Sequence, residues 1–394
     1  MMKMNPNFLS ASIGLFALMS SATFAQGPLT PPASGDSVIG PDAALSTGTP
    51  VPFMKTLHEV EPRMPISQPA SAAAITINTS GSYYLTENLF FLENGISIAA
   101  DDVTLDLNGF AVTHENLVDG GSAIILQSGV SNITIRNGSI AEGGLLGTVF
   151  NNGISSSSNV TNVRVTDLHV RNCANQGIEL PKTGGTIVKR CQVRSTTGTG
   201  IEAEIVSQCT VNEADSSAID TRIANGCEVL GPGGILAEVA SHCRSTVDGT
   251  NAAGLAADLV DDCEGDSQSG KGIAGLLVYN SRGECASGDI GIDAEIVYRS
   301  FGQAVNSTGI RADHGVAHSM ASSSGLTGTG IRGQNVTNCR TFSNNLAAGI
   351  LADQTISFSH GNGGSITGVT VIGCSQQLGA PITGTNRFFN KPLP

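Results

Sequence analysis

The chain has 394 residues, a net charge of −13, 49 glycines, no tryptophan and only 13% charged residues. So few charges exclude a coiled coil or a disordered tail, because both depend on many charged side chains. The glycines follow no three-residue period, which excludes collagen. The acidic balance argues against a nucleic-acid partner, which would require a basic surface. This composition is typical of repetitive β structure.

The first 25 residues have the organisation of a secretory signal peptide. Lys3 precedes an apolar run from Phe8 to Met19, and Thr23 and Ala25 are small residues suited to cleavage after Ala25. The run is too short to cross a bilayer. We therefore expect an exported protein, extracellular or periplasmic, without a membrane span. Residues 26–64 are rich in Pro, Ser and Gly and predict an extended lead-in.

An internal repeat begins after this lead-in. An isoleucine or leucine recurs every 16 to 30 residues, often after a glycine, and a small residue usually follows two positions later. The 14 repeat positions are Ile96, Ile124, Ile154, Ile178, Ile201, Ile219, Ile235, Leu255, Ile273, Ile292, Ile310, Ile331, Ile350 and Ile366.

One copy of such a repeat cannot bury its own apolar face, whereas stacked copies can. Alternation places the isoleucine and the small residue two positions later on the same inward face. The sequence therefore predicts an all-β chain, a parallel β-helix of about 14 coils forming a single domain over residues 65–390. The coils vary in length, which favours the right-handed form over the left-handed form with its strict six-residue register.

Several segments resemble a known superfamily. Gly81–Thr86, Gly95–Ile98, Asp102–Phe110 and the preceding His58–Arg63 are similar to the opening of secreted bacterial proteins with the right-handed, pectate-lyase-like parallel β-helix. The resemblance implies the fold for residues 56 to 390. It does not imply one activity, because the superfamily contains polysaccharide lyases, hydrolases and epimerases as well as adhesins and surface proteins.

The nine cysteines follow the repeat, commonly eight residues after the isoleucine. Stacking at one inward position favours a ladder of buried thiols over disulfides, because parallel Cβ vectors do not suit the disulfide torsion. No Cys-x-x-Cys pair indicates a metal site. Ser281, Ser300 and His318 replace cysteine on three successive coils, and such a break in a repeat often marks a functional region.

The same coils contain a candidate site. Tyr279 and Tyr298 precede the broken cysteine positions, and stacked tyrosines can pack against sugar rings. Charged residues follow the isoleucines at outward positions, within about 5 to 10 Å of one another by coil stacking. The candidate substrate-binding residues are Tyr279, Tyr298 and Asp293, the catalytic candidates are Arg311, His314 and Arg332, and the metal candidates are Asp293, Glu295 and Asp313.

These residue types suit a uronate lyase. Such an enzyme must neutralise the substrate carboxylate and remove the C5 proton with a base. Arg332, or a Ca²⁺ held by the three carboxylates, would neutralise the carboxylate. Arg311 or His314 would act as the base. A glycoside hydrolase is less favoured, since Asp261-Asp262 and Ser359-His360-Gly361 depart from the motifs of pectin-type hydrolases.

Two functions remain open from the sequence. The first is a secreted protein that binds or processes a polysaccharide or a cell-surface glycan, with an acidic polymer cleaved by lyase chemistry. The second is a non-catalytic extracellular protein with a structural or adhesive role. Alternating outward charges also occur where they only solvate a β-helix face, and the scarcity of aromatic residues favours the second function. We expect a monomer in either case.

Overall fold

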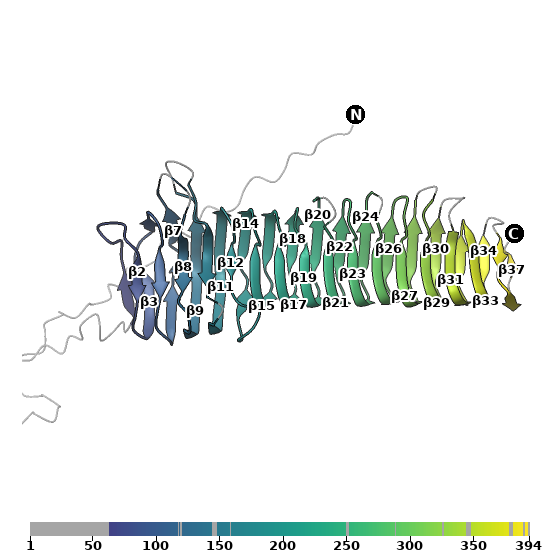
Figure 1. The fold of residues 1–394 in the computed structure, drawn as a ribbon, viewed down its shortest axis with the longest axis horizontal. Helices are drawn as coiled ribbons and strands as arrows, with labels where there is room; N and C mark the ends of the chain where they lie inside the picture. Colours follow the sequence, from purple (N-terminus) through teal and green to yellow (C-terminus); the bar gives the residue numbers. More distant parts are fainter. Residues whose placement is uncertain are drawn as a thin grey trace, which may run out of the picture. The chain divides into compact units, whose positions relative to one another are not determined.

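The computed structural model describes residues 63–392 except 117, 119, 144–147, 158, 250–251, 288, 325–326, 344–347, 378–380 and 389–390. The predicted signal peptide, and the lead-in up to residue 62, lie outside the described residues. Pro62–Pro394 forms one compact unit. All of its secondary structure in the described part is β-strand, and every strand pairs in parallel with the next coil (Figure 1). No helix in this part of the chain could span a membrane.

The strands fall into three columns, each formed by strands that pair from coil to coil. The first column consists of β2 (Ile75–Ile77), β5 (Ile96–Ile98), β8 (Ser122–Leu126), β10 (Asn152–Ser156), β12 (Ile178–Glu179), β15 (Ile201–Ser207), β17 (Ile219–Asn225), β19 (Ile235–Ser241), β21 (Leu255–Asp261), β23 (Ile273–Tyr279), β25 (Ile292–Tyr298), β27 (Ile310–Ala317), β29 (Ile331–Thr337), β31 (Ala348–Ser357), β33 (Ser365–Ile372) and β35 (Ile382–Thr383).

The second column consists of β1 (Met64–Ile66), β3 (Gly81–Leu85), β6 (Val103–Asp106), the first parts of β9 (Ser131–Ala141) and β11 (Thr161–Cys173), β13 (Ile187–Lys189) and, near the C-terminus, β36 (Asn386–Phe388). β15 pairs with β12 along its first part and with β13 along its last part. From β15 to β33, one bent strand therefore supplies both columns.

The third column consists of β4 (Leu89–Phe91), β7 (Ala111–His114), the last parts of β9 and β11, β14 (Gln192–Thr196), β16 (Thr210–Ala214), β18 (Glu228–Gly231), β20 (Arg244–Val247), β22 (Glu264–Ser267), β24 (Arg282–Cys285), β26 (Phe301–Ala304), β28 (Met320–Ser323), β30 (Arg340–Ser343), β32 (His360–Asn362), β34 (Ser375–Gln377) and β37 (Lys391–Pro392).

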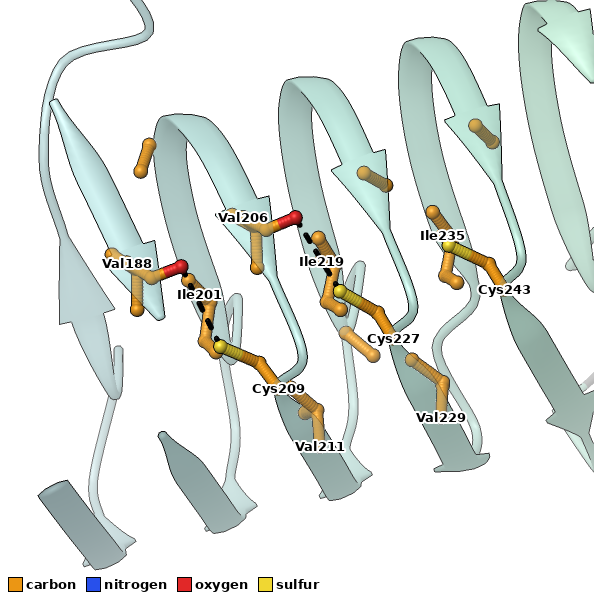
Figure 2. Packing of buried hydrophobic residues seen from close by; sticks show 14 of the residues in the cluster. Val188, Ile201, Val206, Cys209, Val211, Ile219, Cys227, Val229, Ile235 and Cys243 are labelled. Atoms are coloured by element: carbon orange, nitrogen blue, oxygen red, sulfur yellow. Dashed lines mark hydrogen bonds between the residues drawn. The ribbon is translucent and has the colours of Figure 1, made fainter. Parts of the chain in front are cut away.

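The predicted isoleucine ladder is the centre of the core. Ile201, Ile219 and Ile235 lie directly in register, and all three are buried (Figure 2). The ladder has 16 members, because Ile75 and Ile382 pair with its two ends. The predicted 14 coils omit these two end coils. The fold class is confirmed as a parallel β-helix of about 16 turns.

The buried thiol ladder is also confirmed, since all nine cysteines are free and buried. Each ladder position directly follows a residue with positive φ, such as Gln208 before Cys209. The Cys191 amide donates to Cys209 Sγ at 3.4 Å. The single thiol hydrogen of Cys209 has two carbonyl oxygens within reach, that of Val188 at 3.7 Å (Figure 2) and that of Ser207 at 3.3 Å. A sulfur at this position thus accepts a hydrogen bond from a backbone amide at the turn of the preceding coil. Cys173 and Cys285 lie outside the ladder, in the third column, where they pair with Thr196 and Ala304, so the ladder contains seven of the nine cysteines.

The serines that replace cysteine do not break the ladder. The amide of Ser281 donates to Ser300 Oγ, and the amide of Ser300 donates to Ser319 Oγ, both at 3.2 Å. A hydroxyl therefore performs the same hydrogen bonding as a thiol. The prediction that His318 occupies this position is wrong, because β27 contains one extra residue between Ala312 and Gly315. The insertion moves Ser319 into the ladder and His318 to the turn.

The inside of the coil becomes narrower along the third column. Val193 and Val211 point inward from β14 and β16, whereas Gly283 and Gly302 occupy the equivalent positions of β24 and β26. A Cβ atom on Gly302 would lie 2.2 Å from the carbonyl oxygen of Gly309. Backbone packs directly against backbone at this point, so only glycine fits.

Candidate functional site

The predicted charged residues lie on consecutive coils of the first column. Asp293 on β25 is in register with Arg311 on β27, which is in register with Arg332 on β29. Arg311 Nε donates to Asp293 Oδ1 at 2.7 Å and its Nη2 to Oδ2 at 2.5 Å. Lys271 Nζ lies 2.6 Å from the same Oδ2. Asp293 is therefore held by two cationic side chains, and its own side chain is only 13% exposed.

This ion pairing fixes the charge state of both partners. Burial would raise the pKa of Asp293, but the hydrogen bonds from Arg311 and Lys271 outweigh it and hold the pKa below its usual value. The hydrogen bond to Asp293 raises the pKa of Arg311 further. Arg311 therefore stays a guanidinium, which works against its predicted role as a base.

The three predicted calcium ligands do not form a suitable site. Lys271 and Arg311 already surround Asp293 with positive charge, which disfavours a divalent cation there. Glu295 Oε2 lies 3.9 Å from Nδ1 of the exposed His314, the residue inserted in β27. Asp313 precedes His314, and both lie opposite Glu295 at this irregularity. Within the described ranges, no group of three or more His, Cys, Asp or Glu side chains is arranged to hold a metal ion.

The two tyrosines lie together but apart from the charged residues. The ring centroids of Tyr279 and Tyr298 are 6.2 Å apart, and His318 packs edge-on against Tyr298 at 5.1 Å. Arg299 Cζ lies 5.0 Å from the Tyr298 ring centroid. Tyr298 follows Asp293 by five residues on one strand, a separation of roughly 16 Å. The predicted site thus divides into an ion-paired cluster and an aromatic corner.

A different part of the molecule has a concave surface that the sequence did not single out. It encloses about 460 Å³ on the outer side of the third column, over β9, β11, β14 and β16. We call it the basic groove. Its lining residues are Ser139, His169, Val170, Arg171, Gln192, Val193, Arg194, Thr210 and Asn212.

Two arginines give the basic groove its charge. Arg171 on β11 and Arg194 on β14 are exposed and directly in register. Like charges in register on neighbouring strands destabilise a sheet unless a counter-charge lies between them. Among the residues that the structure describes, no carboxylate forms an ion pair with either arginine. Both guanidinium groups are therefore available to an anion.

Polar side chains complete the basic groove. His169 is in register with Gln192, and its Nδ1 lies 3.1 Å from Gln192 Oε1. A carbonyl oxygen only accepts, so Nδ1 is the donor and the neutral ring keeps its lone pair on Nε2. Asn212 lies in register with Arg194 and adds an amide to the same surface.

A local charge count would have found this region. Residues 136–194 contain seven of the 20 Lys and Arg residues but only three Asp and Glu residues, a surplus of four positive charges in an acidic chain. No break in the repeat marks this region, so a charge count is the signal that distinguishes it.

No protein-family model matches the chain, and no curated protein matches its sequence. Among solved structures, the A-module of the mannuronan C-5 epimerase AlgE6 from Azotobacter vinelandii aligns with 80% of this chain and 91% of that module. The identity is 11% and the TM-score is 0.33.

Proposed function

We propose that this protein is exported and binds an acidic polysaccharide in the basic groove. The observation that supports the proposal is the pair of exposed, in-register arginines, Arg171 and Arg194, without a carboxylate partner among the described residues. Guanidinium groups bind carboxylates through paired, charge-assisted hydrogen bonds. His169, Gln192 and Asn212 offer donors and acceptors for sugar hydroxyls.

The shape of the basic groove favours a polymer over a small anion. It crosses four consecutive coils, which corresponds to roughly 15 Å along the stack. Outward positions recur once per coil, so a chain of repeating sugars meets a series of similar positions. The local surplus of positive charge counteracts the repulsion that a net charge of −13 exerts on an acidic polymer.

The lyase chemistry expected from the sequence fits this groove better than the Asp293 cluster. In such a β-elimination the arginines neutralise the uronate carboxylate, and His169 Nε2 takes the C5 proton. A C4=C5 double bond forms as the C4–O bond breaks, and the leaving oxygen is protonated from water. His169 is favoured as the base because its hydrogen bond to Gln192 leaves the Nε2 lone pair free.

The experiment compares binding of a polyuronate with binding of the same polymer after carboxyl reduction, with and without calcium. The variants are the double substitution Arg171→Gln and Arg194→Gln and the matched control Arg311→Gln, whose arginine is already paired with Asp293. Two lost charge-assisted hydrogen bonds, at about 1.5 kcal/mol each, should weaken binding about 100-fold. The control should bind as the wild type does.

Ultraviolet absorbance of unsaturated products tests the elimination separately, and His169→Gln should abolish it while binding persists. Equal binding of the polyuronate by the wild type and the double variant would contradict the groove. A folded protein that binds neither polymer would favour the second function, a non-catalytic structural or adhesive protein.

A further inference from the structure

Aromatic residues are distributed very unevenly along the solenoid. Residues 151–278 contain none, whereas five occur in the next 80 residues: Tyr279, Tyr298, Phe301, Phe342 and Phe358. None of these five is buried in the core, and Phe358 is 66% exposed. Exposed aromatic rings that follow a long run of coils without any aromatic residue indicate a contact with another molecule.

Part of this set forms a compact patch on the third column. Phe301, Met320 and Arg340 lie in register on β26, β28 and β30, and Arg340 Cζ lies 4.8 Å from the ring centroid of Phe342. We call these four residues the aromatic–arginine patch. Met320 is 46% exposed. Aromatic residues, methionine and arginine are the types enriched in protein–protein interfaces.

An acidic strip lies beside this patch on the same sheet. It consists of Glu264 and Asp266 on β22 and Glu284 on β24. Arg282 lies among these carboxylates and approaches Glu264 and Glu284, and Arg244 pairs with Glu264 at 3.3 Å, so the strip keeps a surplus of one negative charge. Partial burial raises the pKa of Asp266 to about 6, and the two neighbouring glutamates raise it further in the same direction. Additional positive charge would stabilise this strip.

From these observations we propose that the aromatic–arginine patch is the contact surface of a symmetric dimer of this chain. β22 and β30 lie two coils to either side of β26. A two-fold axis through Phe301, parallel to the strands, therefore places Arg340 of one copy opposite Glu264 of the other, and the reverse contact follows by symmetry. Phe301 and Met320 fill the centre of the contact.

The charges argue for a second copy rather than an acidic polymer at this patch. The acidic strip separates the patch from the basic groove along the third column, so it would repel a polyuronate that extends from the groove. The same strip complements Arg340, for which no carboxylate partner is found within the described ranges. The dimer differs from the monomer expected from the sequence, and it is independent of the proposed polysaccharide function.

The test is sedimentation equilibrium of the mature protein with two charge reversals, Arg340→Glu and Glu264→Arg, studied singly and mixed. Each variant alone should dimerise at least about tenfold more weakly, because each of its two symmetric contacts becomes repulsive. An equimolar mixture should recover wild-type dimerisation, since the introduced carboxylate of one variant meets the introduced guanidinium of the other. Misfolding of either variant would prevent this recovery, and circular dichroism checks the fold independently.

Phe301→Ser supplies a second variant that leaves the charges unchanged, and it should also weaken the dimer. Arg311→Gln, on the other side of the coil, should leave dimerisation unchanged. A wild-type protein that stays monomeric over the accessible concentrations would overturn the proposal. So would a dimer that the charge reversals leave intact, or a mixture that dimerises no better than its components.

Discussion

Arg194 and Arg311 occupy comparable outward positions on the solenoid but have different neighbours one coil away. Arg311 meets Asp293 and forms two hydrogen bonds with it. Arg194 meets Arg171 on one side and Asn212 on the other. In a parallel solenoid, the residue one coil away decides whether a charge is used within the protein or remains available to a ligand.

The interiors of the two regions also differ. Valines fill the inside of β14 and β16 beneath the basic groove, whereas glycines occupy the inside of β24 and β26. The first region resembles an ordinary aliphatic core, and the second depends on direct backbone contact. Substitutions inside the coil therefore test the difference in packing, and substitutions outside the coil test the difference in charge pairing.

The largest effect on stability is expected from a substitution inside the narrow part of the coil, at β26. Gly302→Ala should lower the free energy of unfolding by about 3 kcal/mol, because the new Cβ would overlap the Gly309 carbonyl oxygen and the backbone must move. Gly315→Ala is the matched control, since the nearest atom to its Cβ is 3.7 Å away. Denaturant unfolding measures both. Equal stabilities of the two variants would show that the narrow coil can widen easily.

The next effect concerns the availability of Arg194. Asn212→Asp places a carboxylate one coil from Arg194, as Asp293 is placed beside Arg311. Polyuronate binding should fall about tenfold, equivalent to about 1.4 kcal/mol, while thermal stability is kept or slightly raised. Asn362→Asp introduces the same change on β32, remote from the basic groove, and should bind normally. Unchanged polyuronate binding by Asn212→Asp would contradict the idea that an ion pair with a carboxylate prevents an arginine from binding the polymer.

A smaller effect is expected from Asp293→Asn. At neutral pH the variant should lose about 1 kcal/mol of stability, because solvent screens the exposed parts of Arg311 and Lys271. The pKa of Asp293 is lowered in the folded state, so its contribution is complete above roughly pH 4 and disappears as the pH falls through the folded pKa. Unfolding curves of wild type and variant should therefore converge in strong acid, and a difference that persists there would point to lost packing instead.

The smallest effect on stability is expected from Asp266→Asn, which should stabilise the protein at neutral pH instead of destabilising it. The pKa of Asp266 is raised to about 6, so the folded protein loses stability as the pH rises from about 4 through 6. Asp266→Asn should consequently be more stable than the wild type above this range, by less than about 1 kcal/mol after solvent screening, and not below it. The measurement needs dilute protein, so that the monomer is compared. A variant that is less stable at every pH would contradict this electrostatic account.

The repeat made the fold predictable, because each coil contributes the same inward isoleucine and the ladder follows from spacing alone. The end coils at Ile75 and Ile382 were not predicted, and strand pairing with Ile96 and Ile366 adds them to the ladder. The one-residue insertion in β27 was missed as well, because Ser319 and His318 are both compatible with the pattern until strand pairing places one of them inward.

The sequence alone determined the parallel β-helix, the buried thiol ladder and the coils on which candidate side chains lie, since these depend on periodicity along the chain. Only the tertiary structure decided which charges are paired. Residues such as Arg171 and Arg194, or Asp293 and Arg311, are 18 to 23 positions apart in sequence and become neighbours through coil stacking. The strength of an interaction between charges depends on their distance in space, and the length of each intervening coil sets that distance.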